Sequence, residues 1–314
     1  MTAYPILPPA ADWPSLAPHP GTITWRRAGD ARVLIAAGYA LLLQVAHPTV
    51  GAGVSEHSQF QRDQWGRLLR TLDYACTIVY GGPQAAGEMG RRIRSFHTQI
   101  NGTRADGQRY HALEPSAYAW VHATLAEGIF AAHERFGRPF TDGQRQELWS
   151  EWRSLGRLLG IRDGDLPPDW RGFRAYVEEM VETQLERTAA VEEVWAALAR
   201  PAAPTSPALA RPVWPILSPP LAHLVRVSTA GLLPATLRRR LGVGWTRADE
   251  LELRVLGAAL RAATPLMPPS LRNTGPGYLR WRREAIARGD VASRARFDRS
   301  RSPRESPAER LGGM

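Results

Sequence analysis

The 314-residue chain contains a single cysteine, Cys76, and no lysine. One cysteine excludes an intramolecular disulfide framework, and it also excludes iron–sulfur clusters and zinc sites built from several thiolates. Residues 1–20 are rich in proline and have neither the basic segment nor the apolar core of a secretory signal. We therefore expect a cytoplasmic protein.

The positive charge is concentrated at one end of the chain. The formal net charge is +10, and all 40 basic residues are arginines. Residues 271–314 carry 11 of these arginines against five acidic residues. This distribution argues against a nucleic-acid partner, and the arginine-, serine- and proline-rich composition from residue 282 onward predicts disorder.

Long apolar runs are also scarce. The longest, Val33–Ala46, has about 14 residues, whereas a membrane-spanning helix needs roughly 20. It predicts a buried core helix and no integral membrane span, with a membrane-dipping helix as the less favoured alternative.

Helical periodicity dominates the rest of the chain, and no alternating run of β-branched residues predicts a strand. The predicted fold is an all-α, multi-helix bundle.

Local signals predict where several helices begin and end. Gly81-Gly82-Pro83 predicts the end of one helix and a break before the next. Thr141 with Gln144 predicts a capping box at the start of another. Residues 48–60 are expected to form a loop, and residues 173–198 a single amphipathic helix.

Seven prolines within residues 199–220 indicate a rigid connector. The predicted organisation is an N-terminal proline-rich extension (1–24), a helical core (25–198), the connector (199–220), a C-terminal helical part packed on the core (221–281) and an arginine-rich tail (282–314).

Common catalytic motifs are absent as well. The sequence has no glycine-rich dinucleotide or P-loop signature, no HExxH and no GxSxG. Nucleotide hydrolysis, zinc-dependent proteolysis and α/β-hydrolase chemistry therefore have no support.

One predicted helix, from Gln64 to Tyr80, carries an unusual polar face. At 100° per residue, Arg67, Arg70, Thr71 and Tyr74 fall within one sector. The face is either a solvated edge with arginine stems packed on the core, or a cluster directed into a pocket, where guanidinium groups meet an anion or polarise a ligand.

Two histidines lie on apolar helix faces. His97 follows Ile93 by four residues, and His122 shares a face with Tyr118. A histidine in such a place is either a satisfied core residue or, as neutral imidazole, an axial ligand of haem iron. Arg94 is available for a haem propionate near His97. Periodicity does not choose between the two histidines.

Several blocks resemble the bacterial DUF2236 family. They are HPTVGAGVSEHSQFQRDQWGRLLRT from residue 47, RRIRSFHTQINGT, YHALEPSAYAWVHATL, GRLLGI, LLPATLRRRLGVGW and PLMPPSLRNTGPGYLRWRREA. In this order they cover roughly residues 25–290. The family groups with the catalytic domain of rubber oxygenase (latex-clearing protein) and with the prenyl-chain-cleaving oxygenase of mycophenolic acid biosynthesis.

The resemblance implies an all-α fold with a globin-like core that holds haem b. The arginine-rich segment around the family's proximal histidine matches residues 94–102, which makes His97 the metal ligand and leaves His122 as the alternative. The family's distal Arg-x-x-Lys-Thr segment matches Arg67 to Thr71, with Arg70 in place of the lysine. An arginine cannot coordinate iron as an amine could.

The family's glutamate base has Glu56, next to His57, as its nearest counterpart. The predicted function is a haem b-dependent oxygenase or oxidase that uses O₂ or peroxide on a small apolar substrate, isoprenoid-like or a secondary metabolite. Arg67, Arg70 and Thr71 would polarise the oxidant or position the substrate, and Glu56 with His57 would move protons. The alternative is a non-catalytic helical protein that binds haem or another ligand, with a basic tail for an anionic partner or peripheral membrane contact.

Overall fold

The computed structural model describes residues 7–58, 63–203 and 210–288, and within these ranges the fold is all-α, as predicted. One short antiparallel hairpin, β1 (Asn101–Thr103) and β2 (Arg109–His111), interrupts the helices. Its register pairs Gly102 with Tyr110. The globin-like arrangement of the core stays a prediction.

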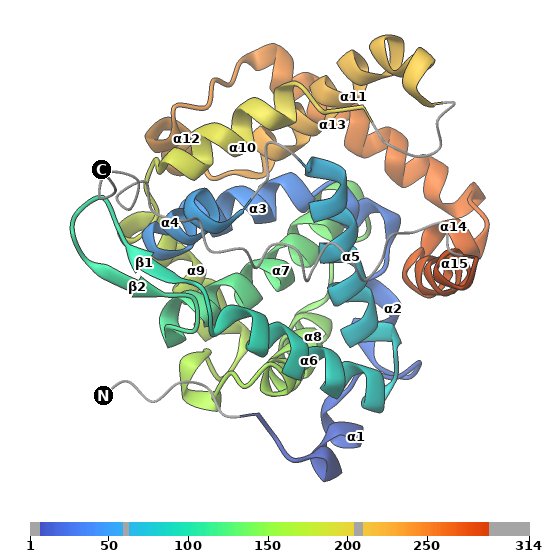
Figure 1. The fold of residues 1–314 in the computed structure, drawn as a ribbon. Coiled ribbons are helices and arrows are strands. Elements are labelled where there is room, and N and C mark those ends of the chain that lie inside the picture. The colour runs from blue at the N-terminus through green and yellow to red at the C-terminus, as the bar shows by residue number, and fades with distance from the viewer. Residues whose placement is uncertain (1–6, 59–62, 204–209, 289–314) are drawn as a thin grey trace, which may run out of the picture.

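The helix α7 (Pro115–Phe136) runs through the middle of the molecule (Figure 1). Its buried residues lie on all sides, as expected for a helix enclosed by others. The main helices of this part of the fold are α3 (Ala37–Val45), α8 (Asp142–Leu158) and α9 (Trp170–Thr183). Contacts with α3 and α8 are among those that fix α7 in place.

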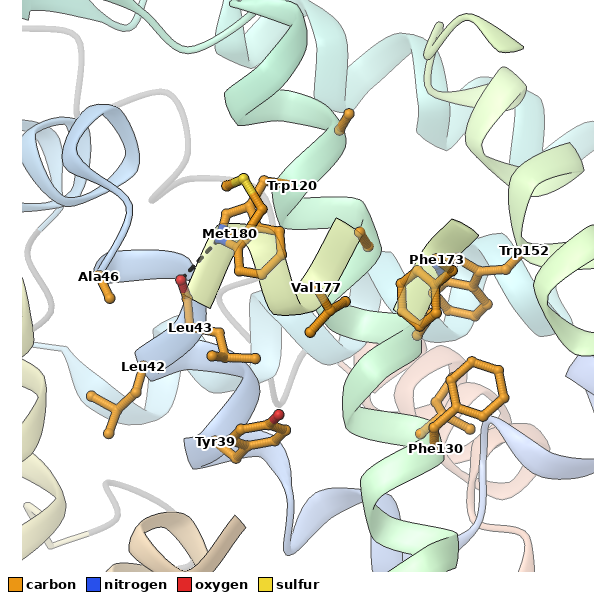
Figure 2. Close-up of a cluster of buried hydrophobic side chains, with 14 of the residues drawn as sticks. Tyr39, Leu42, Leu43, Ala46, Trp120, Phe130, Trp152, Phe173, Val177 and Met180 are labelled. Atoms are coloured by element: carbon orange, nitrogen blue, oxygen red, sulfur yellow. Dashed lines mark hydrogen bonds between the residues drawn. The ribbon is translucent and has the colours of Figure 1, made fainter. Parts of the chain in front are cut away.

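Large side chains from these helices interlock in the core (Figure 2). Trp120 and Phe130 come from α7, Trp152 from α8 and Phe173 from α9. The indole nitrogen of Trp120 donates a hydrogen bond to the carbonyl oxygen of Leu43 at 2.9 Å. The buried polar atom of this tryptophan is therefore satisfied, and this hydrogen bond offsets the cost of removing the N–H group from water.

The apolar run at residues 33–46 is not one helix, and it is not buried throughout as predicted, because Leu34 near its start is 48% exposed. A 3₁₀ turn, η2 (Ala31–Leu34), precedes α3, and the side chain of Asp30 accepts from the backbone N–H of Arg32 at its start. Leu42 and Leu43 have no exposed surface. None of the helices in the described ranges combines the length and the apolar composition that crossing a membrane requires.

The N-terminal extension packs on the core. After η1 (Ala10–Asp12), the short helix α1 (Trp13–Leu16) contacts α6 (Pro83–His97) and α8. The next helix, α2 (Ile23–Arg27), is held by a carboxylate of α8, because Glu151 accepts from the backbone N–H groups of Ile23 and Thr24 at 3.1 and 2.7 Å. These two donors would otherwise be unpaired at the helix start.

The helices α5 (Gln64–Tyr80) and α6 (Pro83–His97) form a hairpin that confirms the predicted break at Gly81-Gly82-Pro83. Asp63 begins α5 by accepting from the backbone N–H of Gly66 at 3.0 Å. Gly82 has a φ of 82°, which L-residues rarely adopt. The glycine thus allows the chain to reverse between the two helices.

A carboxylate on α5 is fixed by the helix α15 (Gly275–Ala287), more than 200 residues further along the chain. Asp73 accepts two hydrogen bonds from Arg282, Nε to Oδ1 at 2.8 Å and Nη2 to Oδ2 at 2.7 Å. The hydroxyl of Tyr278 donates to the same carboxylate at 2.7 Å. The Asp73 and Arg282 side chains are only 22% and 11% exposed, so this contact holds α15 against α5.

The C-terminal part also packs on the core. Its remaining elements are α11 (Ala210–Leu232), α12 (Ala235–Leu241), α13 (Arg247–Ala263), η4 (Thr264–Leu266) and α14 (Pro269–Arg272). α11 contacts α3 and α10 (Ala189–Ala199), and α13 contacts α7. The predicted connector at 199–220 is partly helical, since α11 begins at Ala210. The tail predicted from residue 282 first completes α15, and residues 289–314 lie outside the described ranges.

Two helix boundaries differ from the sequence-based expectation. The segment after His47, expected to be a loop, is the helix α4 (Pro48–His57). The single helix expected over 173–198 divides into α9 and α10 (Ala189–Ala199), with the 3₁₀ turn η3 (Asp163–Asp165) preceding α9. The guanidinium of Arg240 donates to the backbone carbonyls of Val181 and Leu185 at 2.6 and 2.9 Å, which satisfies the end of α9.

Candidate functional site

Most predicted site residues lie at the open end of the α5/α6 hairpin. The fully buried residues of the two helices are confined to the closed end and are Ile78, Val79, Tyr80, Ala86, Gly87 and Gly90. The open end, where α5 begins and α6 ends, carries Arg67, Arg70 and His97 at half-buried positions. The hairpin therefore holds its polar residues where core packing is incomplete.

His97 is the last residue of α6, and its ring is fixed by its own helix. The Nδ1 atom lies 2.7 Å from the carbonyl oxygen of Ile93. Since a carbonyl only accepts, Nδ1 carries the proton and Nε2 keeps its lone pair. Burial lowers the pKa of His97, which favours the neutral ring at pH 7. A neutral histidine whose second nitrogen bonds a backbone carbonyl is typical of a metal ligand.

Two buried donors close to His97 lack hydrogen-bond partners among the described residues. They are Nη1 of Arg94, one turn earlier on α6, and the hydroxyl of Tyr118 on α7. The rings of His97 and Tyr118 meet edge to face with their centroids 5.6 Å apart. The pKa of Tyr118 is raised by burial and partly lowered by the charge of Arg94, so these two residues are neighbours. Unpaired buried donors are costly, and native proteins usually complete them with a ligand or water.

The arginines of α5 are both oriented by polar neighbours. The Nη1 group of Arg67 donates to the hydroxyl of Ser58. The Nη1 group of Arg70 lies 3.0 Å from a carboxylate oxygen of Asp63, the residue that caps α5. Burial and the charge of Arg70 lower the pKa of Arg67, although a guanidinium stays charged. The hydroxyl of Thr71 donates to the backbone carbonyl of Arg67 at 3.0 Å, which orients it along the helix.

Tyr74 lies one turn further along α5. Burial raises the pKa of its hydroxyl, and the positive charges of Arg92 and Arg70 oppose this shift. Arg92 belongs to α6, so Tyr74 lies where the two helices of the hairpin meet. The face predicted from the 100° rotation is thus partly turned toward α6 and is not wholly solvated.

Glu56 and His57 come together with the β-hairpin at the end of α4. The hydroxyl of Tyr110 donates to Glu56 at 2.6 Å, and His57 Nε2 donates to the carbonyl oxygen of Asn101 at 3.1 Å. The same His57 nitrogen lies 3.9 Å from the Glu56 carboxylate. Burial and the Glu56 hydrogen bond raise the pKa of Tyr110, so the hydroxyl keeps its proton. These contacts run to the hairpin and not to α5.

His122 is used in the contact between α7 and α8. Its Nε2 donates to the carbonyl oxygen of Trp152 at 2.9 Å, and the Trp152 indole donates to the carbonyl oxygen of His122 at 3.0 Å. The two rings stack with their centroids 5.3 Å apart. Burial lowers the pKa of His122 to about 4. The reciprocal bonds give His122 a packing role, and its buried Nδ1 has no partner among the described residues.

A pocket of about 530 Å³ was missed by the sequence reasoning. It is lined by His47, Arg104, Glu114, Tyr176, Glu179 and Met180, among others. His47 precedes Pro48 at the start of α4, and its buried Nδ1 has no partner among the described residues. Burial lowers the pKa of His47 to about 4. The lining of this pocket includes neither His97 nor the arginines of α5. Helical periodicity gave no indication of the pocket.

Protein ligands for a bare metal ion are not grouped in the described part of the chain. No three histidine, cysteine, aspartate or glutamate side chains lie close enough there to hold an ion. A haem has a smaller requirement, because the porphyrin supplies four ligands and the protein needs to add only one or two.

Comparison with known proteins places the chain in an oxygenase family. The family described as "ER-bound oxygenase mpaB/B'/Rubber oxygenase, catalytic domain" matches residues 25–262. Two uncharacterised relatives, from Mycobacterium bovis and Mycobacterium tuberculosis, are each 24% identical over 232 residues, covering 73% of this chain and 87% of the relative. No solved structure matches the chain. Because the match includes the α5/α6 hairpin and most of the helical core, the chain belongs to the family of the mpaB-type and rubber oxygenase catalytic domains.

Proposed function

We propose that the chain is a cytoplasmic, haem b-dependent oxygenase or oxidase that acts on a small apolar substrate, isoprenoid-like or a secondary metabolite. The family supports oxygenase activity. The observation that carries the haem is the hydrogen bond from His97 Nδ1 to the Ile93 carbonyl at 2.7 Å, which leaves Nε2 as a ligand atom. The unpaired donors of Arg94 and Tyr118 beside it fit the carboxylates of a haem.

His97, Arg94 and Tyr118 would hold the cofactor. When bound, haem supplies the redox chemistry with O₂ or peroxide. Burial of His97 keeps the ring neutral, so the lone pair on Nε2 is available at pH 7 without loss of a proton. Arg94 would place a permanent positive charge next to a propionate, where the Tyr118 hydroxyl adds a second donor.

Arg67 and Arg70 would act on the oxidant or the substrate. Ser58 and Asp63 orient the two guanidinium groups, so little side-chain freedom remains to be lost when they meet a polar group. The charge of these two arginines does not depend on pH in the physiological range. They would therefore polarise the oxidant or position the substrate without transferring protons. Glu56, held by Tyr110, and His57 would move protons at the edge of the site.

The first experiment is the absorption spectrum of protein produced with ample haem precursor. Wild type is expected to show a Soret band, and His97→Ala is expected to lose it while free imidazole restores it. His223→Ala is the matched control, because His223 is exposed and its Nε2 contacts Glu252 on the surface at 2.8 Å. A Soret band that survives in His97→Ala and disappears in His122→Gln would move the ligand to His122. No Soret band in reconstituted wild type would contradict haem binding.

The second experiment tests the arginines of α5. Arg67→Met removes the charge and keeps much of the apolar stem, so the Soret band is expected to persist while turnover falls by about 10²-fold, the scale of one lost electrostatic contact in a transition state. Full turnover in Arg67→Met would contradict the role assigned to this residue. Wild-type protein that binds haem but oxidises no apolar substrate would favour the non-catalytic alternative.

A further inference from the structure

The pocket of about 530 Å³ lies where two helices begin. The first residues of α4 and of α7 line it, together with Tyr176, Glu179 and Met180 of α9. Met180 also belongs to the hydrophobic core shown in Figure 2, so this part of the wall is fixed by packing. None of the residues proposed to bind haem or to act on the oxidant lines the pocket. A cavity of this size is suited to a small organic molecule.

His47, at the start of α4, is a buried polar residue of this lining that lacks a partner. It is only 7% exposed, and its ring makes no hydrogen bond with another residue in the described ranges. Burial and the nearby charge of Arg104 lower the pKa of His47 to about 4, so the ring is neutral at pH 7 and one nitrogen keeps a lone pair. An unpaired buried polar group is costly, and native proteins usually complete it with a ligand or water.

The charged groups around the pocket are mainly acidic. Three carboxylates line it, and they are those of Glu114, Asp165 and Glu179. Asp165 is ion-paired with Arg162 at 2.7 Å. Arg104, the arginine in the lining, is ion-paired with Asp106 at 2.7 Å. The other two carboxylates have no cationic partner among the residues that the structure describes. The pocket therefore offers two uncompensated negative charges, although the formal net charge of the chain is +10.

These two carboxylates belong to different elements. Glu114 precedes α7, and the hydroxyls of Ser116 and Thr49 donate to its two oxygens at 3.3 and 3.4 Å. Glu179 lies on α9 close to Tyr176, since burial and the charge of Glu179 both raise the pKa of Tyr176. In the described ranges no three histidine or carboxylate groups are close enough to hold one ion, so the two carboxylates and the imidazole do not converge on a single point. An elongated ligand with a cation at each end suits this arrangement.

We propose that the pocket binds a short diammonium cation. One ammonium group would pair with the carboxylate of Glu114 and donate to the lone pair of His47, and the other would pair with Glu179. An ammonium group only donates hydrogen bonds, which suits a carboxylate and a neutral imidazole. The hydrocarbon between the two cations would lie against Met180 and the ring of Tyr176, which give the apolar part of the ligand a matching surface.

The test is isothermal titration calorimetry with the full-length protein in about 150 mM salt, which screens long-range attraction. The probe is 1,4-diaminobutane, and butylamine, 1,4-butanediol and butanoate are compared with it. The diamine is expected to bind at least about tenfold more tightly than butylamine, because the monoamine leaves one carboxylate unpaired. Glu179→Gln should lower the affinity for the diamine to about that for butylamine, and His47→Leu should weaken diamine binding as well.

Glu182→Gln is the matched control. Glu182 is exposed on the same helix and does not line the pocket, so diamine binding should stay unchanged in this variant. Equal weakening by Glu179→Gln and Glu182→Gln would indicate general attraction to the charge of α9 and overturn the proposal. Equal affinities for the diamine and butylamine, or no binding of the diamine, would contradict it, and a preference for butanoate would assign the pocket to an anion at Arg104. Because calorimetry needs no bound haem, none of these outcomes depends on the proposed function.

Discussion

The buried carboxylate of Glu127, in the middle of α7, offers a quantitative test of the structure. Glu127 is only 6% exposed and accepts hydrogen bonds from the Tyr39 hydroxyl at 3.0 Å and from Arg174 Nη1 at 2.8 Å. Burial raises the pKa of Glu127, and the charge of Arg174 opposes that shift. Arg174→Met would keep the apolar stem of the side chain and leave the carboxylate with Tyr39 alone.

The expected cost follows from the burial of the two partners. Removing one member of a fully buried ion pair typically costs 3–5 kcal/mol, on the order seen for uncompensated charges. The Arg174 side chain is 37% exposed, so solvent already screens part of this interaction. We expect the free energy of unfolding at pH 8 to fall by about 2 kcal/mol.

The pH dependence has a definite sign. A carboxyl group whose folded pKa is raised binds more protons in the folded state than in the unfolded state. The unfavourable contribution of Glu127 is therefore absent below its ordinary pKa and grows as pH rises through the raised value. Loss of Arg174 raises the folded pKa further, so the destabilisation should be larger at pH 8 than at pH 5.

Urea unfolding at the two pH values measures this effect. Arg171→Met, at an exposed position three residues earlier on α9, is the control and should change stability by less than about 0.5 kcal/mol. Adding Glu127→Gln to Arg174→Met should recover most of the loss, because the amide oxygen can still accept from Tyr39. Equal effects of the two arginine substitutions, or no recovery in the double variant, would refute the reasoning.

Two further predictions concern packing and acid sensitivity. A Cβ atom at Gly90 of α6 would overlap the backbone carbonyl of Leu158 in α8, so Gly90→Ala should lower stability by about 1–3 kcal/mol. Gly143→Ala is the control, because a Cβ there would meet nothing within 4 Å, and stability should stay equal or rise by up to about 1 kcal/mol. Thermal or urea unfolding measures both variants. Equal effects of the two substitutions would contradict the α6–α8 contact. His122 has its pKa lowered to about 4, so it contributes stability that is lost as pH falls from its ordinary value of 6.5. In His122→Gln, the slope of unfolding free energy against pH over this window should therefore fall by up to about 1.4 kcal/mol per pH unit, and an unchanged slope would show that the ring is protonated in the fold.

Local signals in the sequence predicted helices where caps and breakers are explicit. The capping box of Thr141 and Gln144 begins α8, as predicted. The glycines of α4, in contrast, led to the prediction of a loop. The contact that requires a glycine in this helix is made with residues elsewhere in the chain. A Cβ at Gly51 would lie 2.6 Å from the carbonyl oxygen of Val45 and 2.8 Å from the Thr188 hydroxyl. Gly51 therefore permits a close approach of helices, which periodicity cannot reveal.

The candidate site was predictable only in part for the same reason. Facial placement put Arg67 and Arg70 on one face of α5 and His97 on a face of α6, because each pattern lies within a single helix; their roles in the site stay predictions. The proximity of Arg94 on α6 to Tyr118 on α7 depends on tertiary packing. The carbonyls at the end of α9 are likewise satisfied by Arg240, a residue more than 50 positions further along the chain. Contacts between distant segments leave no local pattern in the sequence.

The contact of Asp73 with α15 bears on where this protein can be shortened. The family match ends at residue 262, before Tyr278 and Arg282. A fragment cut at that boundary would leave the Asp73 carboxylate without its bidentate partner, on the same helix that carries Arg67 and Arg70. The smallest fragment suited to spectroscopy or crystallisation should therefore extend to residue 288, because the position of the arginine-bearing helix depends on a segment beyond the residues that match the family.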